Sequence, residues 1–99
     1  MAAVGDYFKT HGATAASRVK AYSAPPLPPA SGRYLTTLSP DTVIGPLELV
    51  LDTGEFVSVL VKGYWMNLAK STSDGHEAWF ARRVPDHTVQ RWRRNGWRD

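Results

Sequence analysis

The stretch KGYWMNLAKSTSDGHEAWF, residues Lys62 to Phe80, decides the fold of this chain of 99 residues. It contains two tryptophans, Trp65 and Trp79, separated by a run rich in Ser, Thr, Asp and Gly. Before that run the side chains alternate with a period of two, which is typical of a β-strand, and one face carries Trp65, Asn67 and Ala69. The stretch therefore predicts two strands joined by a polar loop.

The residues before this stretch extend the strand pattern. The segment FVSVLVKG, residues 56–63, is largely apolar on both faces and predicts a strand that is central or covered on both sides. The turn DTGE joins it to TVIGPLELVLD, residues 42–52, where Gly45-Pro46 indicates a bend or bulge. We expect a buried core at Leu49, Val57, Val59, Val61 and Leu68.

Shorter segments complete the prediction. RYLTTL, residues 33–38, and HEAWFA, residues 76–81, are expected to be short strands. Five or so short strands with turn signals between them predict a mainly β fold and a small barrel. Residues 1 to 16 predict a short helix from the spacing of Val4, Tyr7 and Phe8. Residues 85 to 95 predict a second helix, with Val89 and Trp92 on its inner face.

A proline-rich segment, YSAPPLPPASG, occupies residues 22–32 and favours polyproline II conformation. The sequence thus divides into an N-terminal arm at 1–32, a barrel at 33–84 and a C-terminal helix and tail at 85–99. The prolines resemble ligands of aromatic grooves, and they equally suit a stiff spacer. The arm residues that we consider for partner binding are Tyr22, Pro25, Pro26, Pro28 and Pro29.

Composition excludes several function classes. The chain has no cysteine and only three histidines, so we expect no disulfide, no thiol chemistry, no metal and no cofactor. No catalytic constellation or glycine-rich phosphate loop is recognisable, so we expect no enzymatic activity. No apolar run is long enough to span a membrane, and no signal peptide is recognisable. We therefore expect a cytoplasmic protein, or one incorporated in a virion.

The segments LTTLSPDTVIG, residues 35–45, GYWMNLAK, residues 63–70, and DGHEAWFARR, residues 74–83, together resemble bacterial SH3-type domains in order and spacing. The resemblance covers about residues 18–84 and implies an SH3-like β-barrel. It departs from the family at Ala78, where a glycine is usual before the last tryptophan. In such a barrel Trp65 and Trp79 would lie close together, either as core residues or in an aromatic groove lined also by Tyr22, Tyr34 or Tyr64.

The C-terminal stretch QRWRRNGWR, residues 90–98, interleaves arginine with tryptophan. This pattern suits a protein interface, nucleic-acid binding, or docking of the rings on the domain with the arginines in water. From Arg82 to Asp99 there are six arginines and two aspartates, so the net charge of +3 is a property of the tail. The tail residues that we consider for partner binding are Arg91, Trp92, Arg94 and Trp97.

These features favour a non-enzymatic structural or adaptor protein that contacts other protein subunits in a multi-copy assembly, such as the head, connector or tail of a phage virion. The SH3-type resemblance implies an alternative, a module that binds cell-wall peptides in an aromatic groove. A third hypothesis is nucleic-acid binding through the basic tail.

Overall fold

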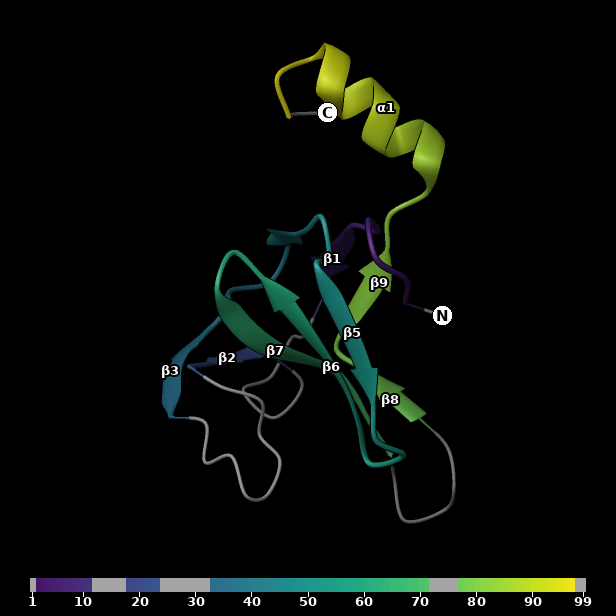
Figure 1. Cartoon of the computed structure of the whole chain (residues 1–99). Coiled ribbons are helices and arrows are strands. Elements are labelled where there is room, and N and C mark those ends of the chain that lie inside the picture. Colours follow the sequence, from purple (N-terminus) through teal and green to yellow (C-terminus); the bar gives the residue numbers. More distant parts are fainter. Residues whose placement is uncertain (1, 12–17, 24–32, 72–76, 98–99) are drawn as a thin grey trace.

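The computed structural model describes residues 2–11, 18–23, 33–71 and 77–97 (Figure 1). Within these residues the chain is mainly β, which confirms the expected class. The elements are β1 (Phe8–Thr10), β2 (Lys20–Tyr22), β3 (Tyr34–Thr37), β4 (Val43–Ile44), β5 (Leu49–Asp52), β6 (Phe56–Val61), β7 (Tyr64–Ser71), β8 (Glu77–Trp79), β9 (Ala81–Arg83) and α1 (Asp86–Arg94).

The larger sheet is organised around β7. Its strand order is β3-β2-β7-β6-β5, and β8 also pairs with β7. One edge of β7 pairs with β6 along nearly its whole length. The other edge pairs first with β2, at Trp65 and Met66, and then with β8, from Ala69 to Ser71. All of these pairings are antiparallel, and a register shift opposite Val57/Ser58 accommodates the twist of the sheet.

The smaller sheet has the order β4-β1-β9, and the two sheets do not close into a barrel in the described part of the chain. The expected helix over residues 1 to 16 is wrong for residues 2–11, because Phe8–Thr10 forms the central strand of this sheet. Tyr7 and Phe8, which suggested a helical stripe, instead belong to two different apolar clusters. The tertiary pairing of β1 with two strands outweighs the local helical spacing.

The main core contains apolar residues from both sheets. Its buried members are Phe8, Val19, Ala21, Ile44, Leu47, Val59, Val61, Met66, Leu68 and Ala81. The predictions that Val57, Val59, Val61 and Leu68 are buried are confirmed.

The prediction for Leu49 is wrong, because this side chain is 51% exposed. The alternation of Leu47, Leu49 and Leu51 does not persist through the bend before β5. Leu47 lies ahead of the strand and is buried, whereas within β5 it is Val50 that packs against the core. Leu49 and Leu51 therefore lie on the other face of an edge strand.

Helix α1 is found where it was predicted, and it lies at one end of the molecule, beyond β1 and β9 (Figure 1). Val89 and Trp92 are buried together with Tyr7 and Val84 in a second apolar cluster. The described residues of the expected N-terminal arm, 1–32, also join the body of the protein, because they supply β1 and β2 to the two sheets.

The connection between β9 and α1 is also tied to the N-terminal segment by charge. Arg83 Nε lies 3.1 Å from Asp6 Oδ2, and its Nη2 lies 3.0 Å from Asp86 Oδ1. The hydrogen bond to Asp6, followed by the charge of the same carboxylate, raises the pKa of Arg83. The side chains of Arg83 and Asp86 are accessible to solvent, so we assign the pairs a positioning role rather than a large share of the stability.

Val59 tests the core assignment. Val59→Ala removes two methyl groups from a fully buried site and is expected to lower the free energy of unfolding by about 1–3 kcal/mol, measured by chemical denaturation. Core truncations cost more than about 0.3 kcal/mol, so a smaller change would mean that Val59 does not lie on the core face of β6.

Gly45 tests the packing of the bend on the N-terminal segment. A Cβ at Gly45 would lie 2.6 Å from Tyr7 Cδ2 and 2.8 Å from the Asp6 carbonyl oxygen, at a φ of +143°. Gly45→Ala is therefore expected to cost about 2–4 kcal/mol of unfolding free energy, from strain and steric overlap together. Gly54→Ala is the matched control: its φ is also positive, but no atom lies within 4 Å, so about 1–2 kcal/mol is expected. Equal losses of unfolding free energy in the two variants would contradict the close approach of Gly45 to Tyr7.

Candidate functional site

The strand register places five apolar side chains in one line across the larger sheet. Directly opposite residues of neighbouring strands have their side chains on the same face. Leu49 of β5 lies opposite Leu60 of β6, and Leu60 lies opposite Trp65 of β7. Trp65 in turn lies opposite Tyr22 of β2, and Tyr22 opposite Tyr34 of β3. We call these five residues the apolar row, and each of them is at least partly exposed.

The next line of residues shows which face this is. Across four of these five strands, the adjacent residues Val50, Val59, Met66 and Ala21 are paired in the same way, and they contribute to or pack against the main core. Successive side chains of a strand point to opposite faces. The apolar row therefore lies on the face of the sheet that is turned away from the core, which we call the outer face.

One end of the apolar row is aromatic. The rings of Tyr22 and Tyr34 are 6.1 Å apart between centroids and meet edge to face, at 69°. Tyr34 is 54% exposed, and its hydroxyl shares a hydrogen bond of 2.6 Å with the Thr37 hydroxyl. Trp65 is partly exposed beside Tyr22. This end thus presents three rings to solvent, one of them oriented by a hydrogen bond.

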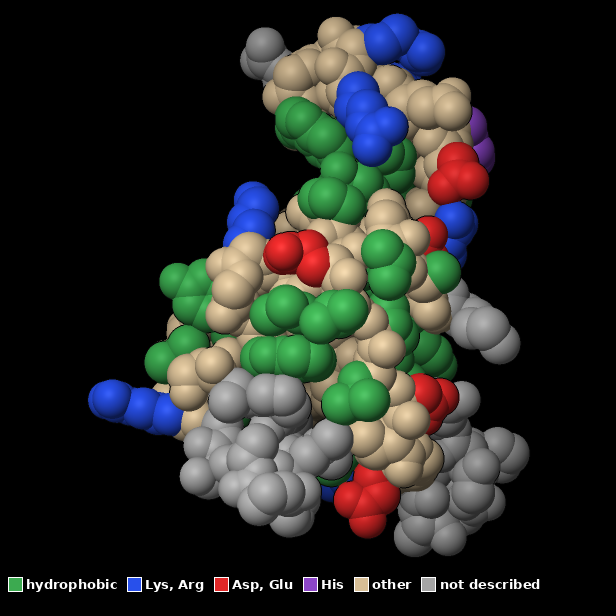
Figure 2. All heavy atoms as spheres, viewed as in Figure 1, with side chains coloured by type: hydrophobic (Ala, Val, Ile, Leu, Met, Phe, Trp, Pro, Cys, Tyr) green, Lys and Arg blue, Asp and Glu red, His purple; other side chains and the backbone are tan. Residues whose placement is uncertain are grey.

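The other end of the apolar row is aliphatic. Leu49 is 51% exposed and Leu51 is 37% exposed, and both belong to β5, an edge strand of the sheet. Figure 2 shows hydrophobic side chains gathered at the surface over the part of the sheet that carries β5. An edge strand with outward leucines combines unpaired backbone groups with apolar surface.

A cationic pocket adjoins the aromatic end. It has a volume of about 300 Å³ and is lined by the charged side chains of Arg18, Lys20 and Lys70. Tyr22 also lines it, so the pocket and the apolar row share a ring. The Nε atom of Arg18 is buried and has no hydrogen-bond partner among the described residues. A buried donor without a partner is costly, so this group favours the binding of an acceptor.

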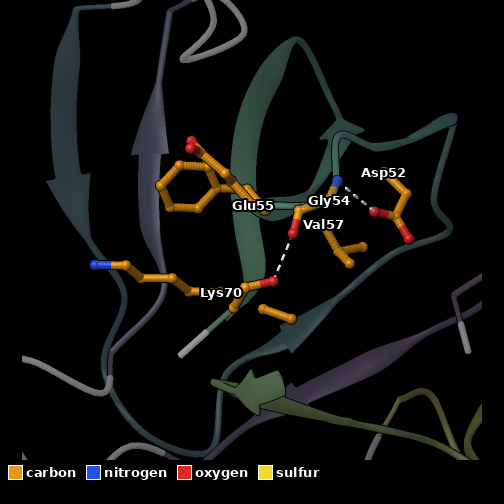
Figure 3. A pocket seen from close by; sticks show the side chains of 8 residues that line it. Asp52, Gly54, Glu55, Val57 and Lys70 are labelled. Carbon is orange, nitrogen blue, oxygen red and sulfur yellow. Dashed lines mark hydrogen bonds between the residues drawn. The ribbon is translucent and has the colours of Figure 1, made fainter. Parts of the chain in front are cut away.

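A second pocket, of about 260 Å³, lies at the turn between β5 and β6 (Figure 3). Asp52 and Glu55 line it, and Lys70 borders both pockets. Asp52 Oδ1 accepts a hydrogen bond of 2.9 Å from the Gly54 amide, and the Ser71 hydroxyl donates one of 2.5 Å to the Gly54 carbonyl. The first bond closes the hairpin turn and the second ties the turn to the end of β7, so both have a structural role.

The larger sheet also contains a buried polar pair. The Ser58 hydroxyl donates a hydrogen bond of 2.7 Å to Asn67 Oδ1. The two residues are directly opposite each other on β6 and β7 and are both buried. Asn67 lines the cationic pocket as well, so the pair fixes its amide group at the pocket wall.

The structure brings together only some of the residues considered for partner binding. Tyr22 and Trp65 are neighbours in the apolar row. Trp79 is not part of this surface: its ring is stacked on Phe8, with centroids 6.1 Å apart, and it packs against the main core. The prolines lie outside the described residues; they are Pro25, Pro26, Pro28 and Pro29.

In the tail, the rings pack on the protein itself. Trp92 is 5% exposed in the second apolar cluster. Trp97 is 48% exposed, and its ring centroid lies 5.1 Å from that of Tyr7. Arg91 and Arg94 are exposed on α1. Trp92 therefore attaches the helix to the smaller sheet, and its ring is not accessible to a partner.

The cations of the pocket were not predicted from the sequence, although the pattern around Arg18 and Lys20 indicates them. The segment RVKAY, residues 18–22, alternates Arg18, Lys20 and Tyr22 with buried Val19 and Ala21. This period of two identifies a strand with a basic and aromatic outer face.

Comparison with known proteins adds no assignment: no family model, no curated protein and no solved structure matches this chain. Among the described residues, no three His, Asp or Glu side chains are grouped as metal ligands would be. The helix found in the described ranges has nine residues and is too short to cross a membrane.

The role of Trp92 can be measured. Trp92→Ala is expected to lower the free energy of unfolding by about 3–5 kcal/mol, because a buried aromatic side chain is lost from the contact between α1 and the smaller sheet. Arg94→Gln, on the exposed side of the same helix, is the control. It is expected to change the free energy of unfolding by less than about 0.5 kcal/mol. Similar small effects for both, measured by urea denaturation, would contradict the docking of the helix.

Proposed function

We propose that this chain is a non-enzymatic structural or adaptor protein that joins protein subunits in a multi-copy assembly. The supporting observation is the edge strand β5, whose Leu49 and Leu51 are exposed on the outer face. An edge strand carries unpaired backbone N–H and C=O groups that can pair with a strand of another chain. Such pairing would also bury the two leucines, which gives the contact a hydrophobic contribution.

The partner that we propose is a second copy of the chain. The sheet has a second edge, β3, whose Tyr34 and Leu35 are also exposed. Pairing of β5 in one copy with β3 in the next would continue the sheet from subunit to subunit. Contacts between two different surfaces generate rings when the rotation closes and filaments when it does not. Both outcomes are multi-copy assemblies.

The proposal includes a likeness to bacterial SH3-type domains and a place in a virion. Neither of these is used as evidence for it. A phage particle is one multi-subunit structure in which a small domain with two apolar edges would serve. The likeness rests on sequence order and spacing in residues 18–84, and it carries a fold analogy, not a binding site.

Sedimentation velocity over a range of protein concentrations tests the proposal. The unmodified chain is expected to form oligomers as its concentration rises. Leu49→Lys and Leu51→Lys place a charge on the edge strand and are expected to keep the chain monomeric, with little loss of stability because both sites are exposed. Tyr64→Lys, at an exposed position outside both edge strands, is the control and should leave association unchanged. A chain that stays monomeric at every concentration would contradict the proposal.

A further inference from the structure

We propose that the aromatic end of the outer face and the adjoining cationic pocket bind single-stranded nucleic acid. In this interaction the phosphates contact Lys20, Lys70 and Arg18, and unstacked bases lie on Tyr22, Tyr34 and Trp65. The inference does not rest on the proposed association, although β3, which carries Tyr34, takes part in both.

The charges of the pocket favour an anion. Arg18, Lys20 and Lys70 line it, and no acidic side chain lines it among the described residues. None of the three cations forms an ion pair within the described ranges. Within the described ranges the Nε of Arg18 has no hydrogen-bond acceptor, and the guanidinium group can form charge-assisted hydrogen bonds to a phosphate. The carboxylates of Asp52 and Glu55 line the neighbouring pocket instead.

The rings of the aromatic end favour bases. Tyr34 and Trp65 flank Tyr22 across three adjacent strands, which are about 5 Å apart, so the rings extend over roughly 10 Å. That length accommodates two or three bases stacked on aromatic side chains. Lys20 is two residues before Tyr22 on β2, so its side chain leaves the same face about 7 Å along the strand from that of Tyr22. Phosphate and base contacts are thus adjacent.

The same geometry discriminates between classes of partner. Bases in a duplex are stacked on one another and cannot reach the rings, so a single strand fits better. An acidic protein segment could occupy the pocket, but it would leave three partly exposed rings without the planar groups that they accommodate. The basic tail is a weaker candidate, because Trp92 is buried and the ring of Trp97 already packs against Tyr7.

Fluorescence anisotropy with a labelled oligothymidine tests the proposal on the full chain. Affinity is expected to fall as salt rises, with a slope of about −2 in a plot of log K against log salt, because three cations each neutralise a phosphate at about −0.7 per contact. The double variant Lys20→Gln/Lys70→Gln is expected to reduce the slope to about −0.7. Lys62→Gln, in the exposed turn between β6 and β7, is the control and should leave the slope unchanged.

Tyr34→Ala tests the stacking contact. Losing one base–aromatic stack is expected to weaken binding by between about 5-fold and about 150-fold at constant salt. Tyr64→Ala removes a ring of similar exposure that is not in the apolar row, and it should have no effect. Circular dichroism of each variant confirms that the fold is retained.

Four results would overturn the proposal. These are the absence of oligothymidine binding at low salt, equal affinity for duplex DNA, and binding of poly-glutamate that depends on Lys20 and Lys70 in the same way. The fourth is loss of binding in Arg94→Gln with no effect of the Lys20→Gln/Lys70→Gln variant, which would place the site on the tail.

Discussion

The structure depends on the pairing of β7 with strands on both of its edges. A strand inside a sheet must find partners for the backbone groups on its two sides, because buried N–H and C=O groups without partners are costly. For β7, β6 provides these partners on one side, while β2 and then β8 provide them on the other. Its neighbours along the chain, β6 and β8, and the distant segment β2 are therefore all held by one strand of eight residues.

This pairing also separates the two faces of the sheet. A shift of one residue in the register would exchange the inner and outer faces of a strand, so the core selects one register. With Met66 and Val59 directed to the core, Trp65 and Leu60 must lie on the outer face. The apolar row is thus a consequence of core packing, and its partial exposure is what makes it available for binding.

Much of the secondary structure could be predicted from local patterns. The alternation in residues 56–71 predicted β6 and β7, and Pro85 with the spacing of Val89 and Trp92 predicted α1. The failures involve information that is not local. Residues 8–10 form a strand because β4 and β9 pair with them, and the exposure of Leu49 follows from a bend and from the edge position of β5.

The candidate site was predictable only in part for the same reason. The sequence identified Tyr22 and Trp65 as residues of interest, but their contact with each other depends on the register between β2 and β7. Trp79 was grouped with Trp65 because an SH3-like barrel would bring the two rings together, whereas β8 directs Trp79 to Phe8. The most direct test is a nuclear Overhauser experiment on the tryptophan rings. The account predicts cross-peaks from Trp65 to Tyr22 and from Trp79 to Phe8, and strong cross-peaks between Trp65 and Trp79 would contradict it.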